Sequence, residues 1–115
     1  MSARAWFACV ALVAWPAWAA SDYPTTDRVQ YVLECMYRHG GSGEYVYKCS
    51  CAIDYLATRF SYDDFVEAST VARYQTLPGE GAGEFRDSAP TRALAKKYRD
   101  AEAEAYQHCG IQKKK

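Results

Sequence analysis

The chain has 115 residues, of which 50% are apolar and 24% are charged, and its 14 basic and 14 acidic side chains leave a formal net charge of zero. This length allows one domain with a modest core. A neutral balance gives no electrostatic reason to expect nucleic acid or an anionic membrane as partner, and neither is expected.

The first 19 residues predict a secretory signal peptide. Arg4 precedes an apolar run that ends at Pro16, and the Ala-Trp-Ala that follows supplies the small residues accepted by signal peptidase. Because the run is shorter than the ~20 residues that a bilayer core requires, cleavage after Ala19 is expected in place of a membrane anchor. The mature chain, residues 20–115, is expected to be one periplasmic helical domain without membrane association.

Helical periodicity and capping signals predict four helices in the mature chain. Ser61, with Asp64 three residues later, marks one helix start. Ser88 marks another, and Gly110 ends the last helix. The predicted ranges are 26–39, 44–60, 62–76 and 90–109. The glycine-rich stretch 77–89 between the last two is a predicted surface loop, in which Phe85 is the residue expected to hold the loop down.

Thr26 or Asp27 can cap the N-terminus of the predicted first helix. Its apolar positions recur at helical spacing and are Val29, Val32, Leu33 and Met36. No strand alternation persists along the chain. The sequence therefore predicts an all-α fold, with four helices in an antiparallel bundle-like array.

Four cysteines remain once Cys9 leaves with the signal peptide. An even number in an exported chain predicts two disulfides. On a helix, Cys49 and Cys51 point about 200° apart and cannot bond to each other. This leaves Cys35–Cys49 with Cys51–Cys109, or Cys35–Cys51 with Cys49–Cys109. Hairpin register favours the first pairing weakly, and both stay open.

Two other uses of the Cys-Ser-Cys stretch are alternatives to a structural role. Cys35 and His39 are four residues apart on one helix, and with Cys49 and Cys51 they could form a zinc or copper carrier site. A thiol–disulfide protein would instead use Cys49 and Cys51 as a redox pair. Cys49 lies inside its helix on the apolar stripe, a poor position for an attacking thiolate. Neither a metal nor another cofactor is expected.

Tyrosine is abundant, with ten in the chain. Several crowd the first two predicted helices, and tyrosine is enriched at protein interfaces because its ring is apolar and its tip is polar. The residues predicted to contact a partner are Tyr37, Tyr45, Tyr47, Tyr55 and Phe85.

The layout "LEC…CSCAIDYLATRFSYDDF…C" behind a signal peptide resembles the type VI amidase-immunity proteins, which are small periplasmic helical proteins with disulfides. In that group a Gly-Tyr follows the cysteine of the second helix, where this chain has Ser50 and Cys51. The stretches "CSCAID" and "TLPGE…FRD" are similar to small uncharacterised proteins of periplasmic quinoprotein dehydrogenase systems. Neither resemblance implies catalytic residues.

No paired carboxylates or free nucleophile with a neighbouring base can be recognised, so no enzymatic activity is predicted. The sequence favours a small periplasmic accessory protein that binds a periplasmic enzyme or toxin. The alternative is a copper or zinc carrier, or a thiol–disulfide protein, that works through Cys49 and Cys51.

Overall fold

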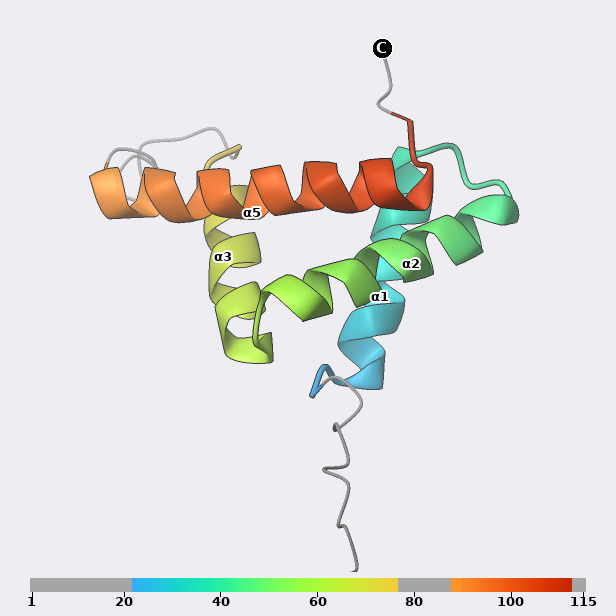
Figure 1. Cartoon of the computed structure of the whole chain (residues 1–115), viewed down its shortest axis with the longest axis horizontal. Coiled ribbons are helices and arrows are strands. Elements are labelled where there is room, and N and C mark those ends of the chain that lie inside the picture. Colours follow the sequence, from blue (N-terminus) through green and yellow to red (C-terminus); the bar gives the residue numbers. More distant parts are fainter. Residues whose placement is uncertain (1–21, 77–87, 113–115) are drawn as a thin grey trace, which may run out of the picture.

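The computed structural model describes residues 22–76 and 88–112. These residues form four helices and contain no strand (Figure 1). The helices are α1 (Thr25–Arg38), α2 (Glu44–Arg59), α3 (Tyr62–Tyr74) and α5 (Ala89–Cys109). The predicted all-α, four-helix, disulfide-stapled fold is therefore confirmed. The predicted signal peptide, 1–19, and Phe85 with most of the predicted loop 77–89 lie outside the described residues.

The helix ends follow the capping residues that the sequence supplies. The side chain of Ser61 accepts a hydrogen bond from the backbone N–H of Asp64 at 3.2 Å, and that of Ser88 accepts one from the N–H of Thr91 at 3.3 Å. Gly110 ends α5 with a φ of 72°, a left-handed conformation that favours glycine. These three predicted caps are confirmed.

Five helix ends differ from the predicted ones by one or two residues: both ends of α1, the ends of α2 and α3, and the start of α5. α1 begins at Thr25, directly after Pro24, so the predicted caps Thr26 and Asp27 lie inside its first turn. Pro24 has a φ of −55°, which suits a helix start, and its carbonyl accepts hydrogen bonds from the N–H groups of Asp27 and Arg28. α3 ends at Tyr74, two residues before the predicted end, because the N–H of Thr76 turns back to the carbonyl of Arg73 three residues earlier.

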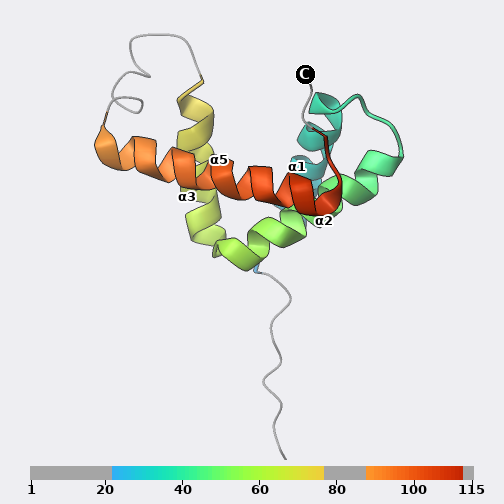
Figure 2. The same ribbon diagram turned by 45° about the horizontal axis from the view of Figure 1, so that its top comes forward.

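The long helix α5 organises the other three. α3 packs on it towards its N-terminal end, and α2 packs on it towards its C-terminal end (Figures 1 and 2). α1 packs against α2 as the first arm of a helical hairpin. α1 and α3 are not a packed pair, so they stand apart on either side of the middle of α5. None of the helices in the described ranges combines the length and apolarity needed to cross a membrane.

The core lies where α2, α3 and α5 meet. Ile53 and Leu56 of α2 are its largest fully buried side chains apart from the cysteines. Tyr23, which precedes α1, is buried too, and its hydroxyl donates to the carbonyl of Phe60 at 2.8 Å. The ring of Tyr23 packs on Phe65 of α3, with the ring centroids 5.1 Å apart. The start of α1 is thereby held against the junction of α2 and α3.

α1 buries only part of the apolar face that the sequence predicted: Val32 and Met36 are half-buried and pack against the core, but Val29 and Leu33 do not. Tyr31 and Cys35 are its buried residues, whereas Val29 and Leu33 are 51% and 60% exposed. The Cys35–Cys49 disulfide turns the face of Cys35 inward. Tyr31 lies one turn before Cys35 on the same face, and Leu33, two residues from Cys35, points away.

Leucine truncation at two sites tests this division between core and surface. Leu56→Ala should lower the free energy of unfolding by about 2–5 kcal/mol, because Leu56 is fully buried and its loss leaves a cavity. Leu33→Ala, the matched control on α1, should change it by about 0.5 kcal/mol or less. Urea unfolding followed by circular dichroism measures both. Equal losses would contradict the assigned rotation of α1.

Candidate functional site: the cleft between α1 and α3

The Cys-Ser-Cys stretch on α2 holds two other helices. Cys49 is bonded to Cys35 of α1, with 5.9 Å between their Cα atoms, and Cys51 is bonded to Cys109 of α5, with 5.8 Å between theirs. This is the pairing that hairpin register favoured. Cys35 and Cys49 are fully buried, whereas Cys51 and Cys109 are half-buried.

The sulfur atoms that a carrier or redox site on this stretch would use are therefore held in these two bonds. Among the described residues, no three His, Cys, Asp or Glu side chains are grouped closely enough to hold a metal ion. His39, the fourth ligand of the metal hypothesis, stacks on Tyr45 at 5.7 Å and meets the ring of Tyr106 edge-on at 5.2 Å. Its imidazole is part of an aromatic cluster near the end of α1.

The tyrosines predicted to contact a partner fall into two groups. Tyr37 and Tyr47 are 88% and 79% exposed. Tyr45 stacks on His39, and the hydroxyl of Tyr55 donates to Glu104 at 3.2 Å. Tyr45 and Tyr55 are thus engaged within the domain, which leaves Tyr37 and Tyr47 as the exposed members of the set.

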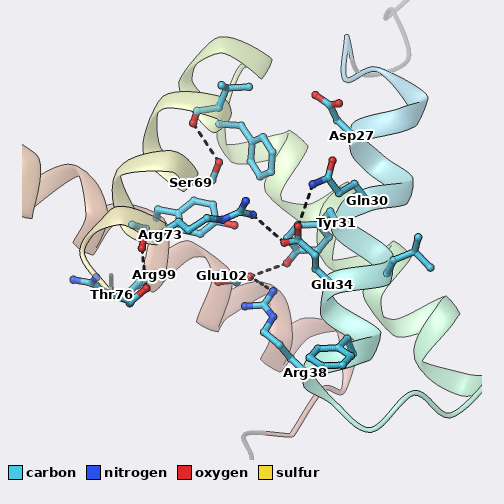
Figure 3. A pocket seen from close by; sticks show the side chains of 16 residues that line it. Asp27, Gln30, Tyr31, Glu34, Arg38, Ser69, Arg73, Thr76, Arg99 and Glu102 are labelled. Atoms are coloured by element: carbon cyan, nitrogen blue, oxygen red, sulfur yellow. Dashed lines mark hydrogen bonds and ion pairs between the residues drawn. The ribbon is translucent and has the colours of Figure 1, made fainter. Parts of the chain in front are cut away.

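Tyr37 borders a cleft that lies between α1 and α3 (Figure 3). We call it the α1–α3 cleft; its volume is about 780 Å³. It exists because α1 and α3 each pack on another helix and not on each other. α1 contributes seven residues to its lining: Asp27, Gln30, Tyr31, Leu33, Glu34, Tyr37 and Arg38. α3 and the residues that follow it contribute Phe65, Val66, Ser69, Ala72, Arg73 and Thr76. α5 contributes Tyr98, Arg99 and Glu102.

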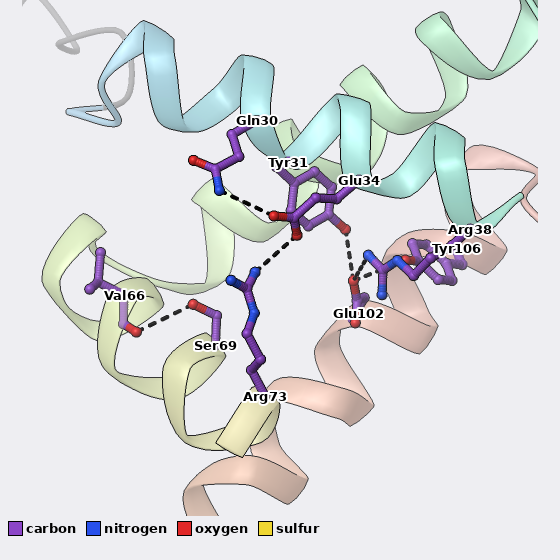
Figure 4. Close-up of polar contacts among 9 residues, drawn as sticks. All are labelled: Gln30, Tyr31, Glu34, Arg38, Val66, Ser69, Arg73, Glu102 and Tyr106. Atoms are coloured by element: carbon purple, nitrogen blue, oxygen red, sulfur yellow. Dashed lines mark hydrogen bonds and ion pairs between the residues drawn. The ribbon is translucent and has the colours of Figure 1, made fainter. Parts of the chain in front are cut away.

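Glu102 of α5 is the polar centre at the base of this cleft (Figure 4). One of its oxygens, Oε1, accepts hydrogen bonds from the hydroxyls of Tyr31, at 3.0 Å, and Tyr106, at 2.9 Å. The guanidinium of Arg38 lies 3.4 Å from the same oxygen. The side chain of Glu102 is only 14% exposed, and a carboxylate with so little access to water needs such partners. The network joins α1 to α5 across 71 positions of sequence.

The phenols around Glu102 remain protonated hydrogen-bond donors. Burial, together with the Glu102 charge, raises the pKa of Tyr106 to about 12. Burial, with the same carboxylate beside it, raises the pKa of Tyr31 far above its ordinary range. Burial also raises the pKa of Tyr98, whose ring lies in the cleft lining next to Phe65 at 6.0 Å.

Two polar side-chain contacts join α1 and α3 across the cleft. The hydroxyl of Tyr62, at the start of α3, donates to the carboxylate of Asp27. Further along, the guanidinium of Arg73 lies 2.9 Å from the carboxylate of Glu34, which also accepts from Gln30 at 3.2 Å (Figure 4). Both members of the Arg73–Glu34 pair are largely exposed, at 64% and 41%, and exposed pairs of this kind are weak.

Apolar side chains also line this cleft. Leu33 of α1 and Val66 of α3, which is 41% exposed, line opposite walls. Phe65, which is buried, continues the apolar surface inward and meets Tyr31 edge-on with 6.3 Å between ring centroids. The cleft thus combines apolar walls with a base rich in hydrogen-bond donors, which is typical of a binding site.

Sequence reasoning identified Tyr37 but missed the rest of this cleft. Its polar centre combines residues of α1 and α5 that are far apart in the chain, and spacing along one helix cannot reveal such a group. One signal was available: Tyr31 and Arg38 lie near Cys35 on α1, so the cysteine could have indicated which face turns towards the protein.

Comparisons of the chain with protein-family models, with curated proteins and with solved structures found no match. The two resemblances noted from sequence motifs therefore stay predictions. The assignment of function rests on the residues of the cleft and on the disulfides described above.

Glu102→Gln tests whether the carboxylate holds the base of the cleft together. The amide keeps an acceptor oxygen but loses the charge, so the free energy of unfolding should fall by about 1–2 kcal/mol. Glu104→Gln is the matched control on the same helix. Glu104 also contacts an arginine and a tyrosine, but its side chain is 50% exposed. The decrease in the free energy of unfolding caused by Glu104→Gln should therefore be much smaller. Urea unfolding compares the two, and equal losses would refute the central role of Glu102.

Proposed function

We propose that this chain is an exported accessory protein that binds a segment of another protein in the α1–α3 cleft. The observation that carries the proposal is the cleft itself, an open volume of about 780 Å³ between two helices that do not pack on each other. Exposed apolar residues at such a place favour a protein partner, because exposed apolar surface in a soluble domain commonly marks a binding site.

The exposed aromatic residue at the cleft adds to this argument. Tyr37 lines the cleft and is 88% exposed, and tyrosine side chains bury much area on binding while losing little conformational freedom. Tyr47 of α2, 79% exposed, is a further candidate contact outside the cleft lining.

Two disulfides support export as part of the proposal. Structural disulfides persist in oxidising compartments such as the periplasm and are rare in the cytosol. Together with the predicted signal peptide, they favour a periplasmic location and a periplasmic enzyme or toxin as partner. On this proposal the chain acts by binding and performs no catalysis.

Site-specific photo-crosslinking in periplasm tests the proposal. A benzoylphenylalanine that replaces Leu33 stands in the cleft lining, and the matched position Glu67 is exposed on α3 outside that lining. We expect the protein with the crosslinker at position 33 to form a discrete adduct with a partner protein. The protein with the crosslinker at position 67 should not form that adduct. The adduct should also be lost on Val66→Asp, which places a charge on the opposite wall, and persist on the control Thr70→Asp.

Either of two results would contradict this use of the cleft. Identical adducts from positions 33 and 67 would indicate nonspecific contact. Full adduct formation by the Val66→Asp protein, with its fold intact by circular dichroism, would place the partner elsewhere.

A further inference from the structure

Two oxygen atoms at the base of the α1–α3 cleft have no hydrogen-bond partner among the described residues. One is the hydroxyl of Tyr98, whose side chain lines the cleft although the residue is only 7% exposed. The other is the Oε2 atom of Glu102, because the hydrogen bonds to that carboxylate all go to Oε1. Polar groups with so little exposure normally have a partner, so the two atoms mark a place for a ligand.

Both atoms can be reached through the cleft. In the described part of the chain, no side-chain oxygen or nitrogen is both fully buried and without a partner, so each of the two keeps access to solvent. The side chains of Tyr98 and Glu102 line the cleft and are otherwise enclosed, so that access is through the cleft. The two residues are four positions apart on α5 and therefore share one face of the helix. One ligand group in the cleft can thus meet both.

The two atoms need opposite hydrogen-bonding groups. Burial raises the pKa of Tyr98, and the Glu102 charge adds to this rise, so the hydroxyl stays protonated and is a donor. A carboxylate oxygen only accepts, so Oε2 of Glu102 needs a donor. The Tyr98 hydroxyl and this oxygen form no hydrogen bond with each other. The complementary ligand group therefore carries an acceptor and a donor on separate atoms.

The charges of the lining disfavour an ionic ligand group. Acidic and basic side chains are balanced there, with Asp27, Glu34 and Glu102 against Arg38, Arg73 and Arg99. An incoming carboxylate would lie beside the Glu102 charge, the strongest charge that acts on Tyr98. An incoming ammonium or guanidinium would lie near Arg38 and Arg73, which act on Tyr98 with the opposite sign. A neutral group avoids both repulsions.

We propose that the base of the α1–α3 cleft binds the carboxamide of a Gln or Asn side chain in the partner segment. A primary amide is neutral and carries its acceptor and its donors on two different atoms. Its carbonyl oxygen accepts from the Tyr98 hydroxyl, and its NH₂ group donates to Oε2 of Glu102. An apolar neighbour in the segment packs between Leu33 and Val66 on the opposite walls. This inference rests on the proposed function, since it names the chemistry of the partner at the same site.

A displayed library of random dodecapeptides, selected on the full oxidised protein, supplies the probe. Enriched peptides are then synthesised with a fluorescent label, and their affinities are measured by fluorescence anisotropy. We expect a consensus that places Gln or Asn near a bulky apolar residue. Replacing that amide residue by an apolar residue of similar size should weaken binding by about tenfold, because the two oxygen atoms at the base then lose their partner.

Tyr98→Phe tests the donor on the protein. It removes the hydroxyl and keeps the ring, so it should weaken the amide peptide by about tenfold. The apolar replacement peptide has no carbonyl to lose this bond, so the same variant should change its affinity by less than about twofold. Tyr47→Phe, the matched control outside the cleft lining, should leave both affinities unchanged. Because the hydroxyl has no partner within the described residues, Tyr98→Phe should also leave the thermal unfolding midpoint unchanged.

A peptide with the matching acid in place of the amide tests the acceptor. Gln→Glu or Asn→Asp in the peptide keeps the shape but puts a second negative charge beside Glu102, so the affinity should fall by about tenfold or more. Glu102→Gln in the protein, with its fold checked by circular dichroism, removes that repulsion and should recover most of the loss. Glu104→Gln, the matched control outside the cleft lining, should recover none of it.

The outcomes separate this inference from the proposed function. Peptides that lack Gln and Asn, or that bind Tyr98→Phe as tightly as the original protein, would overturn the carboxamide inference. If no peptide is enriched, the inference is overturned as well. The Tyr98 comparison decides the matter even where Glu102→Gln does not fold. In each of these cases, the crosslinks from position 33 still decide separately whether a protein partner uses the cleft.

Discussion

The rest of the structure depends on the opposite directions of Cys49 and Cys51. A helix rotates by about 100° per residue, so these two side chains leave α2 on different sides. One bond fixes α1 and the other fixes the C-terminal end of α5. Each bond of this type contributes about 2–4 kcal/mol in a small domain. Two of them supplement a core whose largest fully buried side chains, the cysteines aside, are Ile53 and Leu56.

The cleft follows from the same constraint. Because α1 is tied to α2, and α3 packs on α5, α1 and α3 have no packed interface between them. The Cys35 bond also sets the rotation of α1, so Tyr31 and Arg38 reach Glu102 while Leu33 stays exposed. A structural disulfide thereby determines which side chains form the base of the binding site and which form its apolar wall.

Local signals predicted the elements well but not the site. The serine caps at Ser61 and Ser88 and the left-handed Gly110 are properties of a few neighbouring residues, and the sequence contains them directly. Cysteine count and helical rotation narrowed the disulfides to two pairings. The hydropathy of α1 identified Val32 and Met36, which pack against the core, but also Val29 and Leu33, which stay exposed because the bond of Cys35 to Cys49 sets the rotation of the helix. The Glu102 network joins distant parts of the chain, which periodicity cannot reveal.

The most direct test of this account is disulfide mapping of protein purified from the periplasm, with an intact mass and a count of free thiols. The account predicts no free thiol in the mature protein, and crosslinked peptides that join Cys35 to Cys49 and Cys51 to Cys109. A bond between Cys49 and Cys51, or free thiols that bind a metal ion, would contradict it. The Cys-Ser-Cys stretch would then itself be the working site, and α1 would lose the constraint that forms the cleft.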